Sequence, residues 1–114
     1  MEAKAGFEAH FEVEGVFHLT PAQEGELYRI AQEAFNNITK HAQANQVHVR
    51  LTGQNSCVRL TIEDNGVGFD PLAIEHGGGQ GFRNMRERAA NIGAHCSFES
   101  VPGQGTKITI EVNE

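Results

Sequence analysis

The chain has 114 residues, 39% of them hydrophobic, which suits one domain with a single core and argues against disorder. Its net charge of -6 argues against a nucleic-acid surface, which needs clustered Lys and Arg. It does not exclude a nucleotide, because a metal ion and a few N–H groups can offset phosphates locally. No run is long and apolar enough for a membrane span or a signal peptide, and Cys57 and Cys96 lack metal-site spacing.

The first predicted element is a strand over residues 7–13, in which apolar residues alternate with polar ones and should bury one face. The apolar set is Phe7, Ala9, Phe11 and Val13. After a turn at Glu14-Gly15, residues 16–19 are expected to form a short second strand.

A helix is predicted from Thr20 to about Ala42. Thr20 can cap it, Pro21 suits its first turn, and Gln23 completes a capping box. Its expected buried stripe is Leu27, Ile30, Ala31, Ala34 and Ile38.

Three polar residues border that stripe at i, i+4 and i+3 spacing: Glu33, Asn37 and Lys40. They form either a solvated edge or one wall of a site. The pair Asn36-Asn37 favours the wall, because Asn is a weak helix former and two in mid-helix need a reason.

Two further strands are predicted, over residues 46–52 and from Val58 to Asp64, joined as a hairpin by a four-residue loop at 53–56. The second strand delivers Asp64 into the stretch Glu63-Asp64-Asn65-Gly66-Val67-Gly68-Phe69-Asp70. A carboxylate there needs a hydrogen-bond donor, which a flat heterocycle with an exocyclic amine would supply. An ordinary Asn-Gly turn explains the same stretch without a ligand.

Residues 70–81 are glycine-rich and are predicted to be a mobile loop over the site, with a plain flexible linker as the alternative. A second helix follows over residues 82–92, with Gly93 ending it. Its N-terminus suits a phosphate. The last two strands are predicted over residues 95–101 and 107–112, with a Pro-Gly turn between them.

Taken together, these segments resemble the ATP-binding catalytic domain of bacterial sensor histidine kinases, in the superfamily shared with DNA gyrase B and MutL. The resemblance rests on Glu33 to Ala42, on Asp64 to Phe69, and on the glycine turns Gly79-Gln80-Gly81 and Gly103-Gln104-Gly105-Thr106. The run Phe82-Arg83-Asn84-Met85-Arg86-Glu87-Arg88 is most similar to the nitrate-sensor and desaturase-sensor subfamily. The resemblance as a whole covers about residues 20–112.

The resemblance implies an α/β two-layer sandwich of the Bergerat ATP-binding type, with a mixed, mainly antiparallel sheet on about three helices. It implies that Asp64 accepts a hydrogen bond from the adenine amine, with Gly68 close to the purine and Thr106 acting through water. Asn37 would ligate Mg²⁺ and Glu33 would act near the γ-phosphate. The remaining implied nucleotide contacts are Lys40, His41, Gly66, Phe69, Gly79, Gly81 and Phe82.

None of the six histidines fits the phosphoacceptor role, so residues 1–114 are expected to be a single catalytic domain whose dimerisation and phosphoacceptor domain is absent. The expected partners are ATP, that domain of a parent kinase and, indirectly, a response regulator. The expected location is the cytoplasm. The alternative is a nucleotide-dependent regulatory module of the same fold, similar to an anti-sigma factor, without histidine phosphorylation.

Overall fold

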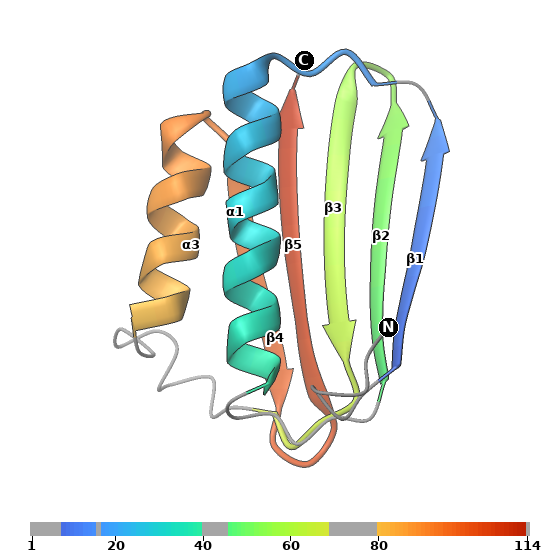
Figure 1. Ribbon diagram of the computed structural model, residues 1–114, viewed down its shortest axis with the longest axis vertical. Helices are drawn as coiled ribbons and strands as arrows, with labels where there is room; N and C mark the ends of the chain where they lie inside the picture. Colours follow the sequence, from blue (N-terminus) through green and yellow to red (C-terminus); the bar gives the residue numbers. More distant parts are fainter. Residues whose placement is uncertain (1–7, 16, 40–45, 69–79, 114) are drawn as a thin grey trace.

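The computed structural model is a two-layer sandwich of one five-stranded sheet and two helices, and it describes residues 8–15, 17–39, 46–68 and 80–113 (Figure 1). The elements are β1 Glu8–Gly15, α1 Pro21–Asn37, β2 Gln46–Gln54, β3 Cys57–Asp64, α3 Gln80–Asn91, β4 His95–Val101 and β5 Gly105–Asn113. The strand order is β1-β2-β3-β5-β4, with β1 parallel to β2 and the other pairs antiparallel. The predicted sandwich is confirmed, although the described ranges hold two helices and not about three.

Helix α1 begins as its sequence predicts. Thr20 Oγ1 accepts a hydrogen bond from the Gln23 backbone N–H at 3.1 Å, and Gln23 Oε1 accepts one from the Thr20 N–H at 2.9 Å. This capping box satisfies two N–H groups that a bare helix start would leave unpaired. The helix ends at Asn37, and Ile38 and Thr39 continue it in a wider π-type turn. Residues 40–42, to which we expected the helix to extend, lie outside the described residues.

One hydrophobic core lies between the helices and the sheet. Its buried apolar residues are Leu27, Ile30, Ala34 and Ile38 from the α1 segment, Phe82, Met85 and Ala89 from α3, and Val47, Val49, Val58, Leu60, Ile62, Ile108, Ile110 and Val112 from the strands. Each large side chain buried in this way contributes about 1.5–3 kcal/mol. The core therefore fixes how the ends of α1, α3 and the central strands sit relative to one another.

Helix α3 begins at Gln80, two residues before its predicted start, so the last two residues of the predicted loop are helical. The helix gives way to a turn in which Gly93 has a φ of +64°, as expected for a glycine that ends a helix. No helix within the described ranges is long and apolar enough to cross a membrane.

The hairpin of β2 and β3 has a two-residue turn, so the predicted four-residue loop is wrong. Gly53 and Gln54 pair with Val58 and Cys57, and only Asn55 and Ser56 turn the chain. Both have positive φ, 54° and 63°, which is the backbone of a type I′ turn. This turn matches the right-handed twist of the flanking strands, and that match outweighs the strain at Ser56.

Strand β1 forms, but its predicted burial is wrong. Phe11 is 65% exposed and Val13 is 68% exposed. Both helices lie toward the β5 and β4 side of the sheet, and neither lies in front of β1 (Figure 1). The second strand expected at residues 16–19 is also wrong, since residues 17–19 have no regular structure; Val16 lies outside the described residues.

Candidate functional site

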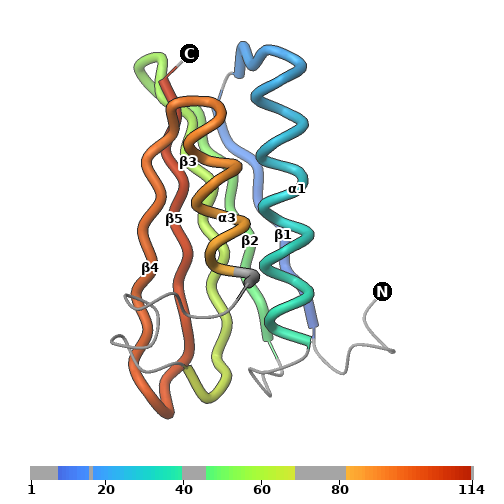
Figure 2. The backbone as a smooth tube through the Cα atoms, turned by 90° about the vertical axis from the view of Figure 1, so that its left-hand side faces the viewer, coloured from blue at the N-terminus to red at the C-terminus, as the bar shows by residue number. Residues whose placement is uncertain are grey.

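Three element ends point toward the same end of the sandwich. The C-terminal ends of α1 and β3 lie near its lower end in both views, and the N-terminal end of α3 is the lower end of that shorter helix, nearer mid-height (Figures 1 and 2). Asn37 is the last residue of α1, Asp64 is the last residue of β3, and Gly81 lies in the first turn of α3. The fold therefore gathers the principal predicted site residues toward one end of the molecule.

Asp64 is a buried carboxylate in a central strand, with 6% of its surface exposed. It lies between Val47 of β2 and Thr106 of β5 in the sheet register. Its Oδ1 accepts a hydrogen bond from the Gly66 N–H at 2.7 Å. Burial raises the pKa of Asp64, while the N–H donors of Gly66 and Thr106 oppose that shift. The protein thus holds a costly buried acid in place with backbone donors, which is typical of a binding group.

Two glycines allow the backbone around Asp64 to pack closely. Gly68 has a φ of +74°, and a Cβ there would lie 2.4 Å from the Val101 carbonyl oxygen. Gly105 has a φ of +106°, and a Cβ there would lie 2.1 Å from the Asp64 carbonyl oxygen. Within the described residues, a glycine is needed at position 68 because the backbone there passes close to Val101 at the end of β4. Gly105 was absent from the predicted site, although the Gly-Gln-Gly pattern marked its turn.

Thr106 is buried and its hydroxyl lies 2.9 Å from the Ser100 hydroxyl. Ser100 Oγ donates to the Gly105 carbonyl at 3.2 Å, which leaves Thr106 as donor between the two hydroxyls. The lone pairs of Thr106 then remain available to accept. Sequence reasoning missed Ser100, whose place opposite Thr106 follows only from the β4–β5 register.

The polar edge of α1 faces α3. Glu33 is half-buried, and its Oε1 accepts a hydrogen bond of 3.5 Å from the Asn84 side-chain amide. One turn later, the Asn37 Nδ2 atom is buried and has no hydrogen-bond partner among the described residues. A buried amide atom without a partner is costly, so this position suits a polar ligand. This edge therefore contacts α3 through Glu33, and its role as the wall of a site stays a prediction.

Four predicted site residues, Lys40, His41, Phe69 and Gly79, lie outside the described residues. Phe82 is 3% exposed and packs edge-on against Phe98 with ring centroids 4.9 Å apart. Its side chain is therefore a core group, and only its backbone lies at the start of α3.

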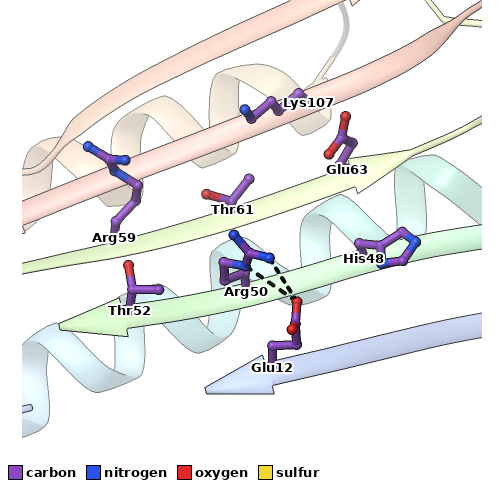
Figure 3. A pocket seen from close by; sticks show the side chains of 8 residues that line it. All are labelled: Glu12, His48, Arg50, Thr52, Arg59, Thr61, Glu63 and Lys107. Atoms are coloured by element: carbon purple, nitrogen blue, oxygen red, sulfur yellow. Dashed lines mark hydrogen bonds and ion pairs between the residues drawn. The ribbon is translucent and has the colours of Figure 1, made fainter. Parts of the chain in front are cut away.

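A separate depression of about 440 Å³ lies on the opposite face of the sheet (Figure 3). It is lined by Glu12, His48, Arg50, Thr52, Arg59, Thr61, Glu63 and Lys107. Arg50 is paired with Glu12 at 3.1 Å, and Arg59 with Glu111 at 2.6 Å. None of the predicted site residues lines it, and its exposed ion pairs are typical of a solvated sheet face.

Residues 22–114 match the family described as histidine kinase-, DNA gyrase B- and HSP90-like ATPase. The chain belongs to this ATPase family. An uncharacterized sensor-like histidine kinase of Chloroflexus aurantiacus is 43% identical over 94 residues, which are 78% of this chain and 16% of the relative. The sensor histidine kinase LiaS of Bacillus subtilis is 40% identical over 89 residues, 78% of this chain and 24% of that protein.

Among solved structures, full-length ShkA in complex with AMPPNP is similar to this ATPase domain, with a TM-score of 0.77 and 23% identity. The alignment covers 96% of this chain and 26% of ShkA. At that identity the likeness supports the fold alone. The ATPase-family chain thus spans a quarter or less of the two relatives named above.

Proposed function

We propose that this chain is the ATP-binding catalytic domain of a two-component sensor histidine kinase. It would bind Mg-ATP in the cytoplasm and donate the γ-phosphoryl group to a histidine on a separate dimerisation domain, which then serves a response regulator. Family membership and the names of the two relatives support this proposal. The observation that carries it is the buried Asp64 carboxylate at the end of β3, which lies toward the same end of the molecule as the end of α1, where the buried Asn37 Nδ2 atom has no hydrogen-bond partner among the described residues.

Adenine would be recognised at Asp64. One carboxylate oxygen already accepts the Gly66 N–H, and the carboxylate retains lone pairs for an exocyclic amine. Thr106 has acceptor capacity for a bridging water beside it. The amine at C6 of adenine would donate to the buried acid, whereas guanine has a carbonyl oxygen at C6, which would place an acceptor against it. This difference favours adenine over guanine.

The triphosphate and Mg²⁺ would lie between Asn37 and the start of α3. The Asn37 side-chain amide carries an oxygen, the kind of ligand that Mg²⁺ prefers. The described residues contain no group of three or more His, Cys, Asp or Glu side chains that could hold a metal. One amide oxygen together with phosphates and waters is a common way to hold Mg²⁺. Lys40, His41, Gly79 and Gly81 would complete the phosphate contacts.

Glu33 would orient or deprotonate the attacking histidine. It lines an open depression of about 350 Å³ formed by α1 and by Arg88 of α3, together with Arg29, Gln32, Phe35 and Asn36. That depression leaves a path by which an acceptor side chain can approach from solvent. Phosphoryl transfer depends mainly on positioning and charge neutralisation, so one carboxylate near the acceptor is sufficient protein chemistry.

Isothermal titration calorimetry with ATP, ADP and GTP, with and without Mg²⁺, tests the binding step. Asp64→Asn should weaken ADP binding by about 1–3 kcal/mol, or roughly 5- to 150-fold. Asn37→Ala should abolish the Mg²⁺ dependence, whereas Asn36→Ala, at an exposed neighbouring position, should not. Equal affinity of wild type and Asp64→Asn would refute the adenine assignment.

Labelled ATP tests the transfer step. The domain should label a histidine-bearing helical hairpin taken from a related kinase, and Glu33→Gln should slow that labelling by about 10²–10⁴-fold while leaving ADP affinity unchanged. If the domain binds Mg-ATP but no label reaches the hairpin, or if a hairpin variant without the histidine is labelled equally, the kinase assignment fails and a nucleotide-dependent module is favoured.

A further inference from the structure

The buried polar side chains that the structure describes lie in a single row across the sheet. They are Asp64, Thr106 and Ser100. Asp64 pairs with Thr106 across β3 and β5, and Thr106 pairs with Ser100 across β5 and β4. Residues opposite one another in neighbouring strands share a face, so these three side chains lie side by side on the core face of the sheet. The proposed adenine site uses two members of the row and gives no role to Ser100.

The Ser100 hydroxyl has one proton, and a contact within the protein uses it. Ser100 Oγ donates to the Gly105 carbonyl oxygen at 3.2 Å, and a carbonyl oxygen can only accept. Ser100 Oγ also lies 2.9 Å from Thr106 Oγ1, so at this second contact Ser100 accepts and Thr106 donates. The proton of the Thr106 hydroxyl is therefore directed toward β4, which lies on the side of β5 away from β3 and Asp64.

This hydrogen-bond pattern leaves the side chains of Asp64 and Thr106 with lone pairs to offer and no proton. The Asp64 carboxylate is an acceptor when it is ionised, and the Thr106 oxygen has already given its proton to Ser100. Two neighbouring acceptors favour a base edge that carries a donor, such as the C6 amine of adenine. A carbonyl oxygen at C6 would instead meet acceptors, so the site would also select its ligand by rejecting the wrong one.

We propose that Ser100 is a positioning residue for base recognition. By accepting the proton of the Thr106 hydroxyl, it removes the donor that a purine with a C6 carbonyl would need. Ser100 acts through Thr106 and need not touch the base itself. This inference rests on the proposed function, because it assumes that Asp64 and Thr106 face the base of a bound nucleotide.

A purely structural role for Ser100 predicts a different result. The bond to the Gly105 carbonyl joins β4 to the start of β5, so its loss would loosen these strands and weaken the binding of every purine nucleotide alike. Loss of the acceptor for Thr106 would instead free a hydroxyl proton beside the base. Inosine diphosphate (IDP) separates the two roles, because it has a carbonyl oxygen in place of the C6 amine of ADP.

NMR titrations of the ¹⁵N-labelled domain with ADP and with IDP, at the same Mg²⁺ concentration, measure both weak and tight binding. Ser100→Ala should tighten IDP binding by about fivefold or more, with no gain for ADP. Ser100→Cys keeps a side chain of similar size but offers only a weak acceptor, so it should change IDP binding in the same direction. Ser100→Thr retains the hydroxyl and should keep the preference of the wild type. Ser97→Ala, on the opposite face of the same strand, is the matched control and should change neither affinity.

A double-mutant cycle tests whether Ser100 acts through Thr106. In a Thr106→Val background, Ser100→Ala should leave IDP affinity unchanged, because no hydroxyl proton remains to be released. An equal gain in both backgrounds would overturn the proposal. So would IDP affinity that stays unchanged or falls in both Ser100→Ala and Ser100→Cys while ADP still binds, and this result would leave the proposed function standing. A wild-type domain that binds neither ADP nor ATP would overturn the proposed function and this inference together.

Discussion

Gly105 and Gly103 offer a matched pair for testing how closely β5 approaches β3 beside Asp64. Both glycines have left-handed backbones, with φ of +106° and +84°. A Cβ at Gly103 would meet nothing within 4 Å, whereas one at Gly105 would lie 2.1 Å from the Asp64 carbonyl oxygen. Replacing each by alanine therefore separates the cost of backbone conformation from the cost of close approach.

The two costs differ in size. A left-handed alanine costs about 1–2 kcal/mol, of which the stiffer unfolded chain returns about 0.4–1, so Gly103→Ala should lose roughly 1 kcal/mol. At Gly105 the added Cβ would lie 2.1 Å from the Asp64 carbonyl oxygen, where an ordinary contact is 3.4–4 Å, so β5 must move away from β3. Losing two or so backbone hydrogen bonds there adds about 1–3 kcal/mol. Gly105→Ala should therefore lose roughly 2–4 kcal/mol in total.

Urea denaturation followed by circular dichroism measures both losses, and thermal scans should show the melting temperature falling by about 4 °C for each kcal/mol. Gly105→Ala should also weaken ADP binding, because the moved strand carries Thr106, whereas Gly103→Ala should not. Equal losses of stability in the two variants would refute the close approach of Gly105 to β3. The left-handed backbone conformation alone would then account for both losses.

Three other measurements test separate features. Thr20→Ala should lose about 1 kcal/mol in urea denaturation, because the Gln23 N–H loses its acceptor. Burial raises the pKa of the Cys96 thiol to about 11, so alkylation near neutral pH should be much slower in the folded domain than in urea; equal rates would contradict its burial. Burial also raises the pKa of Asp64 above its ordinary value of 3.8, so its contribution to stability is complete below that pH and is lost as the pH rises through the raised pKa. Asp64→Asn should lack this loss in denaturation series from about pH 3 to 7.

Local patterns predicted most elements because the residues that define them are adjacent in sequence. The capping box at Thr20 set the start of α1, and alternation located β2, β3, β4 and β5 within a few residues. Periodicity does not say what lies opposite a face, which is why Phe11 and Val13 were expected inside. The turn at Asn55 and Ser56 was missed because Asn-Ser lacks the glycine that usually marks a type I′ turn.

Some residues of the candidate site could be identified from local sequence, and others depend on contacts between distant elements. Asp64, Asn37 and Glu33 were identified from single stretches, and the fold brings the ends of their elements to one end of the molecule. Ser100 and Gly105 depend on the register between β4 and β5, and Asn84 reaches Glu33 only through helix packing. Such contacts join residues 5 to 51 positions apart, and no local pattern encodes them.

The parallel pairing of β1 and β2 places the start of β1 and the end of β5 at opposite ends of the sheet. Glu8 pairs with Gln46, whose backbone N–H is held by the Asn65 side chain next to Asp64, while Asn113 pairs with Cys57 at the opposite end. Any segment joined ahead of Glu8 would pull on the sheet at the end that carries Asp64, and any segment joined after Asn113 would pull at the opposite end. A signal transmitted as tension or twist along the polypeptide would reach the two ends of the domain unequally.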